Sequence, residues 1–207
     1  MSNLRVLSGI VASALLLSGC LLAPAPAPPN YYVIDYQQPD VEIGSSPAQP
    51  ISEVVHVLDG RVNRTYERRQ IVQRSDGPQI TYRATDLWGV DLGVAMADLL
   101  ADSLRERTLF EEIQRHHRVQ RPDLEVYSEL RVVEHICCNN IEPQARVAAV
   151  LQLRRQADQT ILVEHRFERF DPLPDNRIAT FVLRVNTILL EEAVKFGDRV
   201  IAYYQRS

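Results

Sequence analysis

The stretch LEVYSELRVVEHICCNNIEPQARVAAVLQLRRQADQTILVEHRF, residues 124–167, decides the fold. Apolar residues alternate with polar ones on the even positions of 124–136 and on the odd positions of 145–153 and 161–167. A period of two is typical of strands that bury one face and expose the other. The three segments therefore predict an antiparallel sheet with one covered face, and residues 157–159 predict a hairpin turn within it.

Two helices are expected to cover that face of the sheet. Asp91 is the expected N-cap of the first helix, whose apolar face comprises Leu92, Met96, Leu99, Leu100, Ser103 and Phe110. The second helix carries a stripe of Val182, Val185, Leu189, Ala193, Phe196, Val200 and Tyr203. Shorter strands are predicted earlier, at 51–58, 70–74 and 79–83. The predicted fold class is α/β (α+β): a two-layer sandwich in which a mainly antiparallel sheet carries two helices packed on one face.

The N-terminus has the pattern of a bacterial lipoprotein signal. Arg5 gives it a basic start, and the apolar run over 6–17 is shorter than the roughly 20 residues that span a bilayer. The run ends in Leu17-Ser18-Gly19-Cys20, which predicts cleavage between Gly19 and Cys20 and lipidation of Cys20. Lipid chains anchor a protein because each buried methylene contributes about 0.8 kcal/mol. The alternative is an ordinary cleaved signal in which Cys20 is incidental.

The residues after Cys20 predict the location and the domain organisation. Position 21 is Leu rather than the Asp that retains lipoproteins at the inner membrane, so we expect the periplasmic face of the outer membrane. Seven of the twelve prolines lie in 20–50, which predicts a tether, and strand-forming residues over 31–36 favour a short strand inside it. The predicted division is a signal peptide over 1–19, the lipidated cysteine and tether over 20–50, and one folded domain over 51–207.

Composition and motifs argue against several functional classes. The 207-residue chain has a net charge of −4 and no basic segment, which speaks against nucleic-acid binding. The sequence has no Gly-rich phosphate loop, no Gly-x-Ser-x-Gly and no His-Glu-x-x-His. We therefore predict no catalytic residue and no cofactor, and the protein is not expected to be an enzyme.

The cysteines and histidines leave alternatives open. For the adjacent Cys137 and Cys138 these are buried thiols, which we favour, a vicinal disulfide, and an intermolecular or metal role. His135 and Cys137 would share one face of a strand and could meet at a zinc ion, but no third ligand is evident, so no metal site is predicted. His165 lies on the apolar face of its strand and is expected to be a core histidine.

The candidate interface comprises Trp88, Arg68, Arg69 and Arg74. Trp88 precedes the first helix and is either a packing residue or an interface anchor, because tryptophan is favoured at interaction hot spots. Each arginine alone is expected to be solvated. Together they are placed to meet an acidic partner surface.

Several short motifs follow one another in a set order. They are the Leu-Ser-Gly-Cys signal, Tyr31-Tyr32-Val33-Ile34-Asp35, YERRQIVQR over 66–74, Ile80-Thr81-Tyr82, Trp88, and the helix with Leu99-Leu100. In this order and spacing, over residues 31–110, the chain resembles the ABC-type transport auxiliary lipoprotein components, which are the lipoproteins of paraquat-inducible and related intermembrane lipid transport systems. The C-terminal half matches as strands followed by a helix.

The resemblance implies a non-enzymatic role on the periplasmic face of the outer membrane. There the protein would dock a mammalian-cell-entry-domain protein, and its further partners would be an inner-membrane permease and ATPase. A homo-oligomer is also compatible with the resemblance. The alternative is an outer-membrane assembly lipoprotein that binds a β-barrel partner. A third class, a periplasmic hydrolase or metal protein, would depend on His135 or Cys137.

Overall fold

The computed structural model describes residues 27–35, 41–116, 120–138 and 140–206. The predicted signal peptide, Gly19 and Cys20 lie outside the described residues. Within them the chain forms one sheet of nine strands and two helices. In chain order the elements are β1 (Asn30–Tyr32), β2 (Ile51–Val57), β3 (Arg61–Val62), β4 (Gln70–Arg74), β5 (Ile80–Trp88), α2 (Leu92–Glu106), β6 (Phe110–Gln114), β7 (Leu124–Cys138), β8 (Ile141–Arg155), β9 (Ile161–Pro172) and α3 (Ile178–Tyr204).

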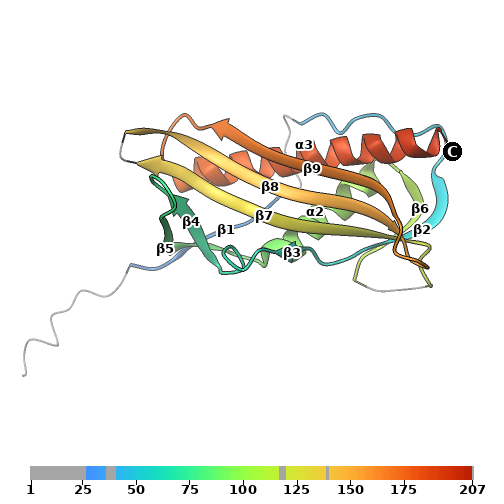
Figure 1. Cartoon of the computed structure of the whole chain (residues 1–207), viewed down its shortest axis with the longest axis horizontal. Coiled ribbons are helices and arrows are strands. Elements are labelled where there is room, and N and C mark those ends of the chain that lie inside the picture. The colour runs from blue at the N-terminus through green and yellow to red at the C-terminus, as the bar shows by residue number, and fades with distance from the viewer. Residues whose placement is uncertain (1–26, 36–40, 117–119, 139, 207) are drawn as a thin grey trace, which may run out of the picture.

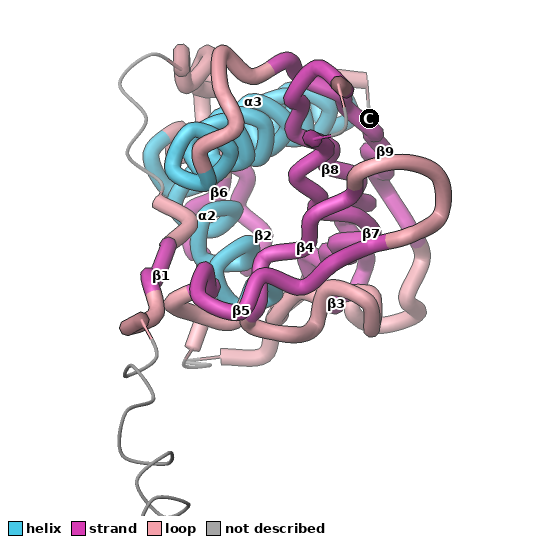
Figure 2. The backbone as a smooth tube through the Cα atoms, turned by 90° about the vertical axis from the view of Figure 1, so that its left-hand side faces the viewer, coloured by secondary structure: helices cyan, strands magenta, loops and turns pink. Residues whose placement is uncertain are grey.

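The three strands predicted from 124–167 form the antiparallel meander β7–β8–β9. They are longer than predicted, since β7 and β8 each have 15 residues and span about 50 Å. Helix α3 has 27 residues and a length of about 40 Å, so it runs along most of the meander (Figure 1). Both helices lie on the same side of the sheet (Figure 2), which confirms the predicted two-layer arrangement.

The second edge of β7 is bordered by three short strands, one after another. β2 pairs with the start of β7, β3 with its middle and β4 with its end, and all three run parallel to it. The outer pairs β2–β6 and β1–β5 are also parallel, whereas β4–β5 is antiparallel. The sheet is therefore partly parallel, a feature that residue alternation cannot report, because alternation separates the two faces of a strand and not its direction.

A β-bulge changes which residues of β7 face the helices. The predicted alternation holds up to Leu130, and the pairing with β8 then shifts between Leu130 and Val132. An extra residue moves every later side chain to the opposite face. As a result Val133 and His135 are buried, whereas Val132 and Ile136 are only half-buried. The expectation that the even positions stay on the covered face is therefore wrong beyond Leu130.

Helix α2 begins and ends at local signals. Asp91 is the N-cap, as predicted, and its Oδ1 accepts hydrogen bonds from the backbone N–H groups of Gly93 at 2.8 Å and Val94 at 3.1 Å. The helix ends at Glu106, and Thr108 then takes a left-handed conformation with φ of 52°. The expectation that Phe110 belongs to the face of this helix is wrong, because the chain has already reversed and Phe110 starts β6.

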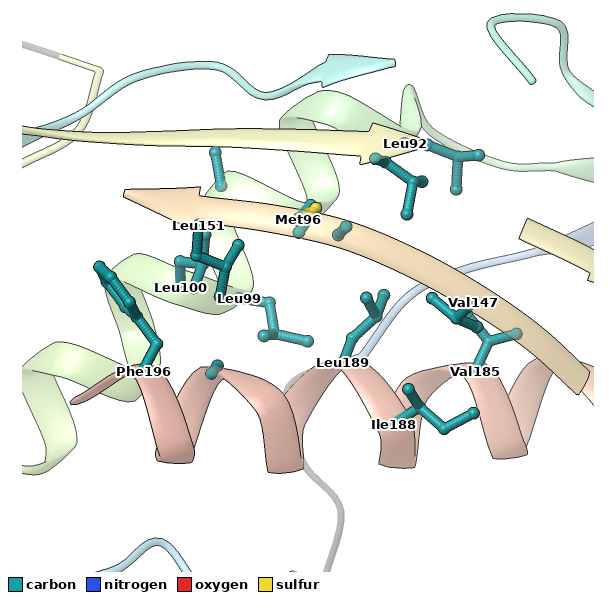
Figure 3. Close-up of a cluster of buried hydrophobic side chains, with 14 of the residues drawn as sticks. Leu92, Met96, Leu99, Leu100, Val147, Leu151, Val185, Ile188, Leu189 and Phe196 are labelled. Atoms are coloured by element: carbon teal, nitrogen blue, oxygen red, sulfur yellow. The ribbon is translucent and has the colours of Figure 1, made fainter. Parts of the chain in front are cut away.

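The core lies between the two helices and the covered face of the sheet (Figure 3). The predicted stripe of α3 is buried over most of its length and packs toward β8 and α2. Burial of such apolar side chains contributes about 1.5–3 kcal/mol each. The buried residues shown there include Leu99, Leu100, Val147, Leu151, Val185, Leu189 and Phe196.

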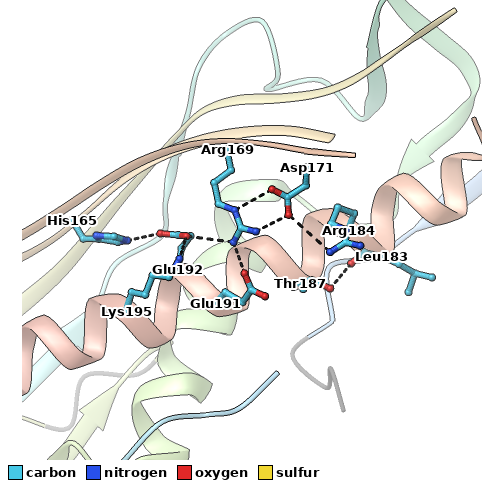
Figure 4. Close-up of polar contacts among 9 residues, drawn as sticks. All are labelled: His165, Arg169, Asp171, Leu183, Arg184, Thr187, Glu191, Glu192 and Lys195. Carbon is cyan, nitrogen blue, oxygen red and sulfur yellow. Dashed lines mark hydrogen bonds and ion pairs between the residues drawn. The ribbon is translucent and has the colours of Figure 1, made fainter. Parts of the chain in front are cut away.

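A polar network fastens α3 to the edge strand β9 (Figure 4). The ring of His165, at its Nε2, and the carboxylate of Glu192 are 2.6 Å apart, and Lys195 Nζ donates to the same carboxylate at 2.6 Å. Arg169 pairs with Asp171 at 2.6 Å and also bonds Glu191. His165 is buried, as expected of a core histidine.

Part of the predicted tether lies against the domain and is held by Arg107. This side chain is only 1% exposed. Its Nη2 and Nε donate to the carbonyl oxygen of Ser45 at 2.8 and 3.1 Å, and its Nη1 donates to the carbonyl of Val194 at 2.8 Å. An ion pair of 2.5 Å with Asp198 completes the set. A buried guanidinium needs such partners, and they join the segment 41–50 to α3.

Candidate interaction surface

Strand β1 brings the end of the predicted tether to the edge of the sheet. It pairs in parallel with the last residues of β5, with Asn30 opposite Asp86 and Tyr32 opposite Trp88. The backbone N–H of Gly89 donates to the carbonyl of Tyr32 at 2.6 Å. A glycine suits this position, because a Cβ there would lie 3.1 Å from Cγ1 of Val33.

A buried carboxylate holds β1 in place. Asp86 accepts hydrogen bonds from Asn30 Nδ2 at 3.2 Å, from Tyr32 Oη at 3.3 Å and from Arg83 Nε at 2.6 Å. Burial pushes the pKa of Asp86 up, but the hydrogen bonds from Arg83 and Asn30 outweigh burial and hold the pKa below its ordinary value. Asp86 therefore stays ionised and ties the tether-side strand to the sheet.

Three apolar side chains are exposed at this edge. Tyr31 is 58% exposed, Val33 is 52% exposed and Val90 is 41% exposed. Val33 and Val90 line a hollow of about 350 Å³, together with Ile34, the first turns of α2 and the carboxylates of Asp35, Asp98 and Asp102. Exposed large apolar side chains that gather in one place mark interaction sites. We call Tyr31, Val33 and Val90, with the adjacent Arg68 and Arg69, the β1-edge patch.

The two arginines of the patch are positioned by their own contacts. Arg69 Nη2 donates to the carbonyl of Gly89 at 2.9 Å, and the guanidinium of Arg68 lies 5.0 Å from the ring centre of Tyr82. Both side chains are exposed, and both line a second hollow of about 280 Å³ that Val90 separates from the first. The patch therefore has an apolar centre, with the cationic groups of Arg68 and Arg69 in one hollow and the carboxylates in the other.

Trp88 lies beneath the patch rather than in it. The indole is 2% exposed and packs against Phe181, with 6.3 Å between the ring centres. Its backbone N–H donates to the carbonyl of Arg69 at 2.7 Å, which holds the segment with Arg68 and Arg69 against the end of β5. An indole with so little exposed surface has a packing role, which was the alternative to an interface anchor.

Arg74 is engaged within the domain. Its guanidinium forms an ion pair of 2.5 Å with the buried carboxylate of Glu134, and Tyr66 Oη donates to the same carboxylate at 2.6 Å. Burial raises the pKa of Glu134, but the hydrogen bonds from Arg74 and Tyr66 outweigh it and keep the pKa below its ordinary value. Of the four residues predicted for an interface, the structure brings only Arg68 and Arg69 to one exposed surface.

The sequence reasoning missed the apolar part of the patch. From the sequence, Tyr31 and Val33 are strand formers and part of a family motif but are not predicted to lie at an interface, and Val90 is not among the candidate residues. The sequence does contain a signal. Apolar strand formers are unusual in a solvated Pro-rich tether, so Tyr31 and Val33 would be expected to contact the domain or a partner. Their exposure depends on the parallel pairing of β1, which is a long-range contact.

Another hollow measures about 590 Å³ and is lined mainly by basic and aromatic side chains, which include Arg115, His116 and Tyr127. Arg115 is already neutralised by ion pairs with Asp59 at 2.7 Å and Asp98 at 2.8 Å.

Within the described parts of the chain no cluster of three or more His, Cys, Asp or Glu side chains could hold a metal ion. No helix in those parts is long and apolar enough to cross a membrane.

Comparison with solved structures supports the fold. Protein XCC0632 from Xanthomonas campestris, of the DUF330 family, superposes with a TM-score of 0.70 at 15% identity, over 86% of this chain and 98% of that one. An uncharacterised protein superposes with a TM-score of 0.63 at 10% identity, over 84% of this chain and 99% of that one. At these identities the likeness concerns the fold alone. No curated protein matches the sequence.

The family follows from a match of the sequence itself. The model of the family described as ABC-type transport auxiliary lipoprotein component matches residues 32–195. The match begins at Tyr32, the last residue of β1, and ends within α3, so it includes β2 to β9 and the whole meander. It confirms the resemblance drawn from residues 31–110. The chain therefore belongs to the family of ABC-type transport auxiliary lipoprotein components.

Proposed function

We propose that this protein is a lipid-anchored docking component of an ABC-type intermembrane lipid transport system, of the mammalian-cell-entry type. It acts without catalysis on the periplasmic face of the outer membrane. There it receives a mammalian-cell-entry-domain protein that leads to an inner-membrane permease and ATPase. The observation that carries the proposal is the place of the β1-edge patch, on the strand that joins the domain to the anchor.

The anchor is lipidated Cys20, which becomes the first residue after cleavage behind Gly19. Four prolines lie between Cys20 and Asn30 and favour an extended chain of about 3.1 Å per residue. The tether then reaches roughly 30 Å from the lipid to the first residue of β1. A tether of this length would hold the folded domain away from the bilayer surface and leave the patch accessible to a partner in the periplasm.

The composition of the patch suits a protein partner. Aromatic and arginine side chains are enriched at the centres of protein interfaces, and Tyr31 with Arg68 and Arg69 supplies both kinds. Val33 and Val90 line a hollow between β1 and α2 that also contains the carboxylates of Asp35, Asp98 and Asp102, and we expect it to receive an apolar side chain of the partner. The partner surface is expected to be apolar at its centre and acidic where it meets Arg68 and Arg69.

The test compares a double variant inside the patch with a control variant at an exposed apolar residue outside it. The double variant Val33→Glu, Val90→Glu places carboxylates in the patch, and Leu183→Glu changes a residue on α3 that is 59% exposed and lies outside it. Each protein is purified from membranes in mild detergent, and the co-purified mammalian-cell-entry-domain protein is quantified. We expect recovery to fall about tenfold or more for the double variant and to stay at the wild-type level for Leu183→Glu.

Two outcomes would overturn the proposal. One is that wild-type protein recovers no transporter component; recovery of a β-barrel protein in its place would support the assembly-lipoprotein alternative. The other concerns the anchor. Cys20→Ser is expected to leave the fold intact, release the protein from the membrane and abolish transport, so full transport by this variant would contradict an anchored docking role.

A further inference from the structure

Cys137 and Cys138 lie at the end of β7, where the strand turns toward β8. Their Sγ atoms are 2.7 Å apart, well inside ordinary non-bonded contact and approaching the separation of about 2.05 Å in a disulfide. Both cysteines are free thiols in the structure. Adjacent residues of a regular strand point to opposite faces, so two neighbouring thiols do not normally meet.

Two backbone features bring the thiols together. The pairing of β7 with β8 shifts between Ile136 and Cys138, which marks a bulge at the end of the strand. Cys138 has a φ of 79°, in the left-handed region that residues other than glycine seldom adopt. Residues in such sparsely populated backbone conformations occur at functional sites more often than elsewhere. The conformation places both sulfur atoms on one side of the chain.

The two thiols differ in access. Cys137 is buried, whereas Cys138 is half-buried and accepts a hydrogen bond from Gln73 Nε2 at 3.2 Å. Burial, and then the hydrogen bond with Cys138, raise the pKa of the Cys137 thiol to about 12. Cys138 is therefore the thiol that an external reagent meets first. Cys137 can reach Cys138 but not a second protein.

We propose that Cys137 and Cys138 form an oxidation site that closes to a vicinal disulfide when Cys138 meets a disulfide oxidant, such as glutathione disulfide or the disulfide of an oxidoreductase. The inference does not rest on the proposed docking function. It concerns the chemistry of the hairpin end alone, and it requires only the purified chain and a disulfide oxidant.

The reaction has two exchange steps. The thiolate of Cys138 attacks one sulfur of the oxidant, which forms a mixed disulfide and expels one thiolate. The thiolate of Cys137 then attacks Sγ of Cys138, which forms the Cys137–Cys138 bond and expels the second thiolate. Two protons leave the cysteines and two electrons pass to the oxidant, which is reduced to two thiols. The second step is favoured despite the high pKa of Cys137 because its sulfur is already in contact with its target.

The oxidation site is connected by hydrogen bonds to β1, the strand at the end of the predicted tether. Gln73, which bonds Cys138, accepts from Arg83 Nη1 at 3.0 Å, and Arg83 in turn bonds Asp86. Asp86 holds Asn30 and Tyr32 of β1. An unbroken line of side-chain hydrogen bonds therefore joins the oxidation site to β1.

The test uses the full chain treated with glutathione disulfide, quenched in acid and alkylated with N-ethylmaleimide in denaturant. Trypsin cleavage after Arg131 and Arg146 releases one peptide with both cysteines, and Cys20 is the only other cysteine of the chain. We expect this peptide to be lighter than the dithiol form by two hydrogen atoms and to take no maleimide. After reduction it should take two.

Two single variants test the order of the steps. Cys137→Ser is expected to retain one glutathione on Cys138, because no neighbouring thiol displaces it. Cys138→Ser is expected to take none in the native state, because Cys137 is buried. The proposal is overturned if the wild-type peptide takes two maleimides without reduction, keeps a glutathione, or appears as a cross-link between two chains.

Discussion

The guanidinium of Arg107 donates two hydrogen bonds to the carbonyl oxygen of Ser45, 62 residues away in the sequence. These bonds join the part of the predicted tether that lies against the domain to the end of α2, and the other bonds of Arg107 reach α3. One buried cation therefore determines where the linking segment leaves the domain. The guanidinium also lies so close to Gly197 of α3 that a Cβ at that position would clash with it.

Gly197→Ala is expected to destabilise the protein, although alanine normally favours a helix. A Cβ at position 197 would lie 2.5 Å from Nη1 of Arg107, whose position is held by several hydrogen bonds. We expect the free energy of unfolding to fall by about 1–3 kcal/mol, measured by urea denaturation. An increase of about 1 kcal/mol, which helix propensity alone predicts, would contradict the close contact.

Asp86→Ala is expected to release β1 while leaving the meander folded. The change removes the acceptor shared by Asn30, Tyr32 and Arg83. Hydrogen exchange of the amides in 27–35 should then quicken by about tenfold, which corresponds to about 1.4 kcal/mol of lost local stability. The matched control is Asp76→Ala, in an exposed turn, which should leave those amides unchanged. Equal exchange in both variants would show that Asp86 does not hold the strand.

His135→Leu is expected to remove a pH-dependent loss of stability. The ring is 1% exposed, and neither nitrogen has a hydrogen-bond partner among the described residues. Burial, and then the charge of Arg83, lower the pKa of His135 from 6.5 to about 4. The unfolded chain therefore binds the proton first, so stability is highest above pH 6.5 and falls by up to about 3 kcal/mol as the pH drops to 4.

The leucine variant should lose that slope and keep or gain stability at pH 7, because an unsatisfied polar ring is replaced by an apolar side chain. Urea denaturation of both proteins at several pH values between 7 and 4 measures the slope. A variant as sensitive to acid in this range as the wild type would show that another group is responsible.

Glu192→Gln is expected to act at a lower pH. Burial raises the pKa of Glu192, but the hydrogen bonds from His165 and Lys195 outweigh it and bring the pKa to about 2. Ionised Glu192 therefore stabilises the fold above the ordinary carboxyl pKa of 4.5, and this contribution, up to about 3 kcal/mol, is lost as the pH falls toward 2. The difference in unfolding free energy between wild type and variant should be largest above pH 5 and shrink below 4.5. A constant difference would contradict the assignment.

The sequence by itself determined the elements that depend on local pattern. Alternation predicted the three strands of the meander, a period near 3.6 predicted both helices, and Asp91 was recognised as the cap that starts α2. These features can be predicted from the sequence because each depends on residues within one turn of helix or one stretch of strand. The family could also be inferred from the sequence, because the short motifs around Trp88 follow one another in a set order.

Only the tertiary structure decided the features that depend on distant partners. The bulge after Leu130 turned His135 toward Phe181 of α3, and the parallel pairing of β1 exposed Val33 beside Val90. The partners of Arg107 lie as far as 91 residues away. Hydrophobic periodicity records which side of an element is covered, but strand direction, bulges and the partners of a buried charge are set by which surfaces meet when the chain folds.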